Sequence, residues 1–198
     1  CDLVAVVGDD RAGSTLREHL DAGRMSSRSL VTVDRPTTTK TRVMARAQQL
    51  VRFDEEDDRD LQERDVEAVL AAIGRAMPQA TAVVFEDYNK GVLVPAVIEG
   101  AIAMARARQL PVVVDPKFRN FFAYRGATVF KPNRRELESA LGAAVDLDHP
   151  ATLPDTLARL GVEHLLLTLG EHGMALVSAD TAATGVVHRV PTTAREVY

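Results

Sequence analysis

The chain has 198 residues, of which 46% are hydrophobic, 26% charged and 5% aromatic, with a formal net charge of −4 at pH 7. The length predicts one domain, and the absence of a basic block excludes a nucleic acid or an anionic membrane surface as the expected partner. The single cysteine, Cys1, excludes an internal disulfide and a cysteine-cluster metal site. No run approaches the ~18 apolar residues of a membrane span and no signal-peptide pattern opens the chain, so a soluble cytoplasmic protein with small-molecule chemistry is expected.

Short apolar runs alternate with segments of helical periodicity along most of the chain. This alternation predicts an α/β fold with a largely parallel sheet flanked by helices. In chain order, strands are predicted at residues 3–7, 30–33, 41–45, 49–53, 81–85, 112–114, 128–130 and 164–168. Apolar side chains at helical spacing predict a helix ending at Gly23 and further helices at residues 57–77, 94–105 and 134–141.

One part of the chain lacks this alternation. Residues 30–54 contain three consecutive predicted strands with no helix between them. Two or three strands alone are marginally stable in water, so this segment must cover something or pair with a second copy. We therefore expect residues 30–54 to form a small β lid inserted in the domain 1–198, with a homodimer through the lid.

Lysines are rare and unevenly placed. Only four of the 24 basic residues are lysines, and three of them, Lys90, Lys117 and Lys131, lie in loops just after predicted strands. The carboxyl ends of parallel strands form the ligand crevice of such sheets, so these lysines predict a site for a polyanion such as a triphosphate. Chance placement on solvated loops is the alternative.

A helix start follows the predicted strand 128–130. Asn133 and Glu136 have the spacing of a capping box, in which each side chain satisfies a backbone amide of the other residue. A glutamate at this junction can also hold water on Mg²⁺, and the asparagine can reach nucleotide phosphates. The two interpretations are compatible.

Four further features of the sequence each allow two interpretations. Residues 168–173 combine a post-strand threonine with glycines three apart, which suits either close backbone approach to a nucleotide or a plain turn. Residues 87–91 and 115–117 each place a carboxylate near a lysine at a strand end, as a local ion pair or as a ligand site. Asp10 either caps the following helix or meets sugar hydroxyls.

Taken in order, these motifs resemble the ribokinase-like carbohydrate kinases. They are Gly-Asp-Asp-x-x-Gly, Thr-Thr-Thr-Lys-x-Arg, Asp-Tyr-x-Lys-Gly, Asp-Pro-Lys, Lys-Pro-Asn-x-x-Glu and Thr-Leu-Gly-x-x-Gly, which begin at residues 8, 37, 87, 115, 131 and 168. Within that superfamily the chain is most similar to the heptose-7-phosphate kinase domain of lipopolysaccharide-core heptose synthesis, which is often fused to an adenylyltransferase. Residues 36–42, 48–54 and 194–198 carry this closer similarity.

The resemblance implies a fold and a set of site residues. The fold would be ribokinase-like, with the chain a partial kinase domain truncated at both ends. The nucleotide, ATP with Mg²⁺, would be bound by Lys117, Asn133, Glu136, Thr168, Gly170 and Gly173, and Glu136 would hold the metal through water. The sugar phosphate would be bound by Asp10, Lys40, Arg42, Gln48, Arg52, Asp87 and Lys90.

The resemblance also implies a reaction. It is ATP-dependent phosphoryl transfer to the anomeric hydroxyl of D-glycero-D-manno-heptose 7-phosphate, which gives the 1,7-bisphosphate. The alternatives are another ribokinase-like kinase acting on a different sugar or a nucleoside, and a non-catalytic nucleotide-binding scaffold. The catalytic base of these kinases is an aspartate in a Gly-Ala-Gly-Asp loop, and these 198 residues contain no such sequence. We therefore expect the base to lie beyond Tyr198, and the chain alone to be nearly inactive.

Overall fold

The computed structural model describes residues 1–198 apart from 47, 150–152, 179–183, 185 and 193–198. The chain forms two compact units. The first contains residues 1–79 and 90–97, and the second contains residues 80–89 and 98–198. The similarity noted at residues 194–198 lies outside the described part.

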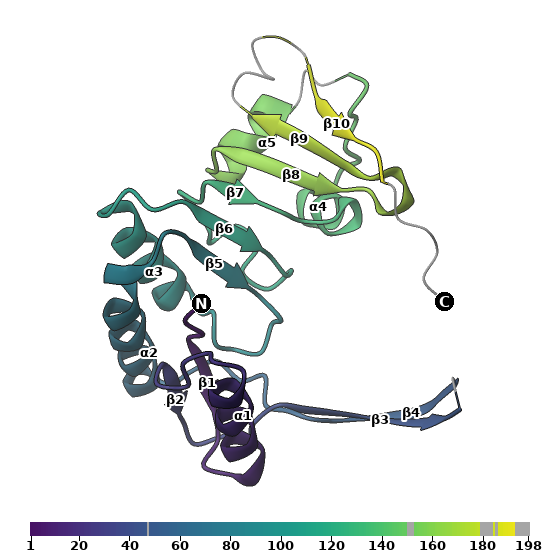
Figure 1. The fold of residues 1–198 in the computed structure, drawn as a ribbon. Helices are drawn as coiled ribbons and strands as arrows, with labels where there is room; N and C mark the ends of the chain where they lie inside the picture. The colour runs from purple at the N-terminus through teal and green to yellow at the C-terminus, as the bar shows by residue number, and fades with distance from the viewer. Residues whose placement is uncertain (47, 150–152, 179–183, 185, 193–198) are drawn as a thin grey trace. The chain divides into compact units, whose positions relative to one another are not determined.

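The second unit is built on a six-stranded sheet with the order β10-β9-β8-β7-β6-β5 (Figure 1). The strands are β5 (Val83–Glu86), β6 (Val112–Asp115), β7 (Val129–Phe130), β8 (His164–Thr168), β9 (Met174–Ser178) and β10 (His188–Val190). Neighbours from β5 to β8 are parallel, whereas β9 and β10 pair antiparallel. The largely parallel sheet expected from the alternating pattern is therefore confirmed.

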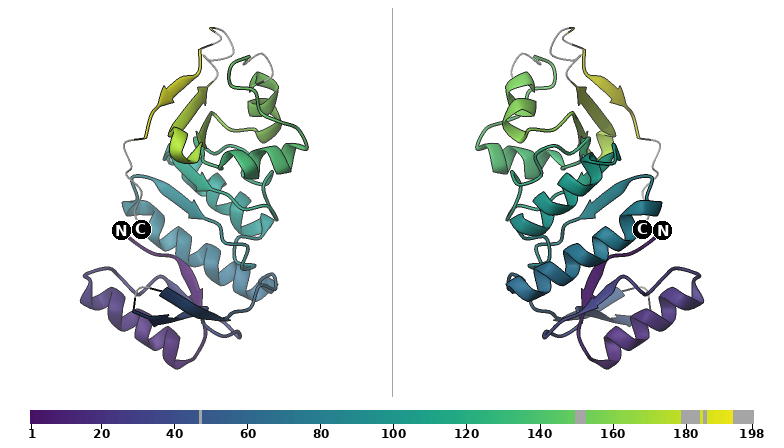
Figure 2. Two further views of the ribbon diagram at one scale, coloured as in Figure 1. Left: turned by 90° about the vertical axis from the view of Figure 1, so that its right-hand side faces the viewer. Right: turned by 90° about the vertical axis from the view of Figure 1, so that its left-hand side faces the viewer.

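Helices and aromatic rings cover this sheet. The helices are α3 (Pro95–Arg106), of which the part from Ile98 belongs to this unit, α4 (Arg134–Leu141) and α5 (Leu153–Leu160). Helix α5 lies against β9 (Figure 2). Side chains such as Val114, Phe130 and Leu165 are fully buried because parallel strands are covered on both faces. The buried ring of Tyr124 contacts the Phe85 ring edge-on.

The first unit is smaller. Its strands β1 (Ala5–Val7) and β2 (Leu30–Thr32) pair in parallel, and helix α1 (Arg11–Ala22) connects them. Helix α2 (Glu63–Ala76), followed by the short 3-10 helix η1 (Met77–Gln79), presents Val69 to a core shared with Leu61 and Val97. Strands β3 (Thr39–Ala45) and β4 (Gln48–Glu55) form a separate antiparallel ribbon whose residues are almost all exposed (Figure 1).

Two differences from the sequence predictions have a physical reason in long-range contacts. The lid contains two strands rather than three, because β2 pairs with β1 through regular parallel register and leaves only β3 and β4 to each other. Helix α2 begins at Glu63 rather than near residue 57, because Leu61 is held outside the helix. Its side chain is buried in the core, and its backbone amide donates to the Gly91 carbonyl.

Candidate functional site

The carboxyl ends of three neighbouring parallel strands bring together most of the predicted nucleotide residues. Lys117 follows β6 by two residues, Asn133 lies three residues after β7, and Thr168 ends β8. Because β6, β7 and β8 run parallel side by side, their carboxyl ends share one edge of the sheet. Asn133 and Thr168 form a backbone bridge, and the Thr168 amide donates to the Pro132 carbonyl.

Lys117 and Glu136 form an ion pair at this edge. Lys117 Nζ donates to Glu136 Oε1 at 2.5 Å, and both side chains remain partly exposed. The hydrogen bond to Glu136 is the main cause that raises the pKa of Lys117, so the ammonium stays charged at neutral pH. A second pair lies beside it, where Lys131 Nζ donates to Asp115 Oδ2 at 2.8 Å. Two lysine ammonium groups therefore lie at this edge of the sheet, each paired with one carboxylate, and their role in binding a triphosphate stays a prediction.

The predicted capping box at the start of α4 is confirmed. Asn133 Oδ1 accepts from the Glu136 amide, and Glu136 Oε2 accepts from the Asn133 amide, each at 2.8 Å. One carboxylate oxygen of Glu136 thus caps the helix by accepting the Asn133 amide, and the other accepts Lys117 Nζ. The cap fixes Glu136 at the strand edge, so its structural role also orients the carboxylate toward the candidate site.

Glycine stands at two positions after β8 for different structural reasons. Gly170 (φ +60°) begins the 3-10 helix η3 (Gly170–His172), and an added Cβ there would meet no neighbouring atom. Gly173 (φ +83°) has no such space, because an added Cβ would collide with the carbonyl oxygen of Val190. Gly173 is therefore required by packing, whereas Gly170 leaves open backbone beside Thr168. Their nucleotide role stays a prediction.

The donor set at this edge fits Mg²⁺ bound mainly by water and phosphate. Among the residues that the structure describes, no group of three or more His, Cys, Asp or Glu side chains could hold a metal ion directly. Mg²⁺ keeps several waters in nucleotide sites and takes only one or two carboxylates from the protein. Glu136 and Asp115, both paired with lysines, are the carboxylates available here.

Asp87 lies at the end of β5 in a buried network. Its side chain accepts the Tyr124 hydroxyl at 2.8 Å and the Asn89 amide at 2.7 Å, and Asn89 Oδ1 accepts the Arg119 amide. Burial, followed by the charge of Asp87, raises the pKa of Tyr124 far above its ordinary value of 10.0. The stability linked to this phenol is therefore complete below about pH 10 and is lost as the pH rises further.

Tyr124→Phe tests this network. The substitution removes only the hydroxyl and leaves a buried carboxylate with one donor fewer, so we expect the free energy of unfolding to fall by about 1–3 kcal/mol. Urea unfolding of Tyr124→Phe and of Tyr88→Phe, the same change at an exposed tyrosine, measures the difference. Equal stability of the two variants would contradict a structural role for the Tyr124–Asp87 bond.

Asp10 is held by backbone amides in the first unit. Its carboxylate caps α1 through the Gly13 amide at 2.7 Å and accepts the Thr37 amide at 2.8 Å. The bond from Thr37, ahead of that from Gly13, lowers the pKa of Asp10. The capping interpretation is thus confirmed, and a contact with sugar hydroxyls stays a prediction.

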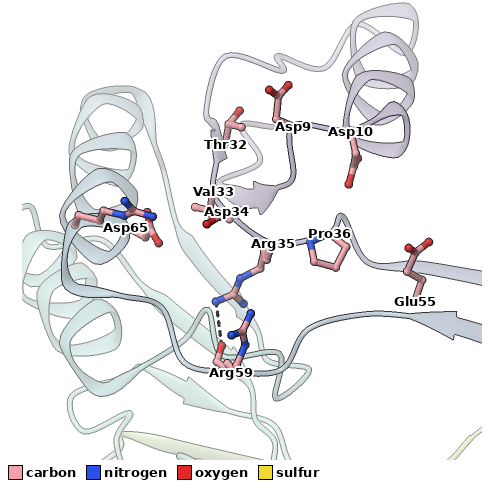
Figure 3. A pocket seen from close by; sticks show the side chains of 11 residues that line it. Asp9, Asp10, Thr32, Val33, Asp34, Arg35, Pro36, Glu55, Arg59 and Asp65 are labelled. Atoms are coloured by element: carbon pink, nitrogen blue, oxygen red, sulfur yellow. Dashed lines mark hydrogen bonds and ion pairs between the residues drawn. The ribbon is translucent and has the colours of Figure 1, made fainter.

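A cavity of about 790 Å³ adjoins Asp10 in the same unit. Figure 3 shows acidic side chains from the loop after β1 and from the end of β4, and the guanidinium groups of Arg35 and Arg59 beside each other. Arg35 donates to the main-chain carbonyls of Lys90 and Arg59, both at 3.0 Å. The cavity is polar and carries both signs of charge.

The register of β3 and β4 divides the predicted substrate-binding residues of the lid between the two faces of the ribbon. Side chains directly opposite each other in an antiparallel pair share a face. Lys40 lies opposite Asp54, and Arg42 lies opposite Arg52, so these four residues share one charged face. Gln48 lies opposite Ala45 and belongs by register to the other face. The lid therefore brings together three of its four predicted substrate residues.

A shared carboxylate joins Lys90 to this charged face. Glu56, which directly follows β4, accepts Lys90 Nζ at 2.5 Å and Lys40 Nζ at 3.0 Å. Lys40 also binds Asp54 at 2.9 Å, and Arg52 Nε binds the other oxygen of Asp54. Sequence reasoning missed Glu56 and Tyr124 because each meets its partner from a distant segment, with no local motif to mark the contact.

Comparisons with known proteins show the family of this chain. A family model described as pfkB family carbohydrate kinase matches residues 1–198. The protein named Bifunctional protein HldE from Rhodospirillum rubrum is 41% identical over 201 residues, covering 100% of this chain and 40% of its own length. Its namesake from Azorhizobium caulinodans is 44% identical over 199 residues, covering 99% and 41%. The chain thus spans about two fifths of the curated relatives it matches.

Solved structures of carbohydrate kinases share the fold. Ribokinase from Giardia lamblia has a TM-score of 0.69 at 19% identity, covering 99% of this chain and 60% of its own. The tetrameric inhibited form of phosphofructokinase-2 from Escherichia coli has a TM-score of 0.70 at 15% identity, covering 98% and 63%. The ribokinase-like α/β fold implied by the motifs is confirmed. With a family model matched along its whole length, the chain belongs to the pfkB family of carbohydrate kinases.

Proposed function

We propose that the protein containing this chain transfers the γ-phosphoryl group of ATP to the anomeric hydroxyl of D-glycero-D-manno-heptose 7-phosphate. The observation that carries the proposal is the meeting of Lys117, Asn133 and Glu136 at adjacent strand ends of one sheet. Membership of a carbohydrate kinase family supports phosphoryl transfer. The heptose assignment rests on the lid motifs at residues 36–42 and 48–54.

The nucleotide half of the reaction would use positioning and charge. Lys117 would leave Glu136 for a phosphate oxygen of ATP, since a phosphate carries more negative charge than a carboxylate. Glu136 would then hold the water shell of Mg²⁺, which offsets phosphate charge during transfer. The 198 residues contain no Gly-Ala-Gly-Asp sequence, so the base for the sugar hydroxyl is not among the residues assigned here.

The charged face of the lid would hold the substrate phosphate. Arg42 and Arg52 lie directly opposite each other in the ribbon, and like charges in that position are destabilising. A phosphate bound on this face would reduce this repulsion, and the cations that share the face could donate charge-assisted hydrogen bonds to it. This arrangement supports a phosphorylated sugar over a neutral one.

The test is substrate profiling of the complete protein. ADP release is measured with heptose 7-phosphate, fructose 6-phosphate and ribose at equal concentrations. We expect kcat/KM for heptose 7-phosphate to exceed kcat/KM for either other sugar by at least about tenfold. The reason is that a sugar lacking the matching groups leaves polar side chains of the site without hydrogen-bond partners. Equal rates with all three sugars would remove the heptose assignment, and no transfer to any sugar would favour the scaffold alternative.

The second face of the lid supports a homodimer. Val43 and Val51 lie opposite each other, and Phe53 lies two residues along on the same face. All three side chains are exposed, and Phe53 is exposed by 58%. An isolated two-stranded ribbon is marginal in water, so we infer that this face pairs with a second copy of the chain.

Phe53→Glu tests the dimer. A charge placed on the apolar face would have to be buried on pairing, so we expect the variant to sediment as a monomer at micromolar concentration while the unmodified protein sediments as a dimer. Phe118→Glu, the same change at an exposed phenylalanine of the second unit, should leave the dimer intact. A monomeric unmodified protein would contradict the inference.

A further inference from the structure

Glu56 holds two of the four lysines of the chain at once. One of its carboxylate oxygens accepts Lys90 Nζ at 2.5 Å, and the other accepts Lys40 Nζ at 3.0 Å. The hydrogen bond to Lys90, followed by that to Lys40, lowers the pKa of Glu56, so the group is charged at neutral pH. A single carboxylate thus bridges the root of the lid and the loop that carries Lys90.

The backbone of that loop is fixed independently of the ion pair. Arg35 donates to the Lys90 carbonyl, and the Leu61 amide donates to the Gly91 carbonyl. Gly91 has φ +67°, and a Cβ there would collide with the carbonyl of Arg59. Lys90 can therefore change its partner by rotating its side chain, without movement of the loop.

The charges of this cluster favour a dianion. Lys40, Lys90 and Arg52 bring three positive charges, and Asp54 and Glu56 bring two negative charges. When Glu56 leaves, Asp54 stays bound to Lys40 and Arg52. Among the ion pairs that the structure describes, Lys90 has Glu56 as its one carboxylate partner. The group that replaces Glu56 therefore meets the Lys90 ammonium without a competing carboxylate from these pairs. A phosphate dianion gains more there than a carboxylate or a hydroxyl group.

We propose that Glu56 is a resident counter-ion that determines substrate specificity, because it occupies the position on Lys40 and Lys90 that the phosphate of the sugar phosphate takes. A dianionic phosphate displaces Glu56 into solvent, and a singly charged or neutral group does not. This inference rests on the proposed function and adds to it a residue that selects for phosphorylated sugars.

Glu56→Gln in the complete protein tests the proposal, with inorganic phosphate as the probe in isothermal titration. The variant removes the competing charge, so we expect phosphate to bind about fivefold more tightly than to the unmodified protein, in line with the loss of two partly exposed ion pairs. Acetate, with a single charge, should compete with phosphate only in the variant. KM for heptose 7-phosphate should fall while kcat stays within about twofold.

Controls separate this effect from a general change of charge or stability. Glu67→Gln removes an exposed carboxylate from α2 and should leave phosphate binding unchanged. Glu56→Asp keeps the negative charge, but the aspartate side chain is too short to bridge both lysines. We expect this variant to bind phosphate with an affinity between those of the unmodified protein and Glu56→Gln. If Glu56→Gln does not fold, the phosphate affinity of Glu56→Asp is the deciding measurement. Unchanged or weaker phosphate binding by the Glu56 variants would overturn the proposal.

The outcome is distinguishable from failure of the proposed function. Phosphate titration requires no turnover, so tighter binding by Glu56→Gln in a protein that does not phosphorylate heptose 7-phosphate would overturn the function and retain the counter-ion role. Normal turnover of heptose 7-phosphate with unchanged phosphate affinity in Glu56→Gln would overturn the counter-ion role alone.

Discussion

Lys117→Met in the complete protein is expected to lower kcat by about 10²–10³-fold, the loss found when one preorganised donor to developing charge is removed. Lys117 is the cation at the end of β6, and its present partner is the Glu136 carboxylate rather than the backbone. The substitution therefore removes phosphate neutralisation with little cost to folding. Steady-state ADP release at saturating heptose 7-phosphate measures the effect.

Arg108→Met provides the control for this substitution. Arg108 is an exposed cation just after α3, so the same loss of one positive charge should leave kcat unchanged. A kcat for Lys117→Met within a factor of about three of the unmodified protein, with both variants folded, would contradict a phosphate role for Lys117.

Glu136→Gln is expected to lower kcat by about 10²-fold and to raise the Mg²⁺ concentration needed for half-maximal activity. The amide oxygen of glutamine can still accept from the Asn133 backbone, so the capping box and the melting temperature should change little. The variant thus separates the metal role of Glu136 from its role in the helix. Titration of activity with Mg²⁺ measures the change.

Glu99→Gln is the matched control for Glu136→Gln. Glu99 is exposed on α3, and its loss should shift neither kcat nor the Mg²⁺ requirement. A Glu136→Gln protein that loses activity with an unchanged Mg²⁺ requirement would contradict the metal assignment and leave Glu136 as a partner of Lys117 only.

Local signals predicted two elements to the residue. Helix α4 has the predicted bounds because its start is fixed by the Asn133 cap and its end by Gly142 in the left-handed region. Strand β8 also has its predicted bounds, since three consecutive leucines and the β-branched Thr168 lie between glycines at positions 161 and 170. Where a cap or turn residue decides the boundary, the neighbouring sequence contains the information.

Long-range contacts decided two of the elements that were predicted less well. The start of α2 depends on Leu61 reaching a core and a carbonyl some thirty residues away, which the acidic segment before it does not reveal. Strand β2 looks like part of the lid in sequence and pairs with β1 only in the fold. Helix α5 was not predicted, although Leu153, Leu157 and Leu160 lie buried at helical spacing.

In the candidate site, too, local signals could be read from the sequence and long-range contacts could not. The meeting of Lys117, Asn133 and Thr168 at one edge could be predicted because parallel strands deliver their following loops to the same edge of a sheet, and because lysines are rare in this chain. Glu56 and Tyr124 could not be predicted, because Glu56 meets Lys90 across 34 positions and Tyr124 meets Asp87 across 37. The spacing of these pairs carries no periodic or motif signal.

In the proposed reaction, the carboxyl ends of β6, β7 and β8 form the site for a metal-bound nucleotide. A crystal structure of the complete protein with Mg²⁺ and ADP tests this placement most directly. We expect a phosphate oxygen within about 3 Å of Lys117 Nζ, and Glu136 facing the water shell of the metal. A nucleotide bound elsewhere, with the Lys117–Glu136 ion pair intact, would contradict it.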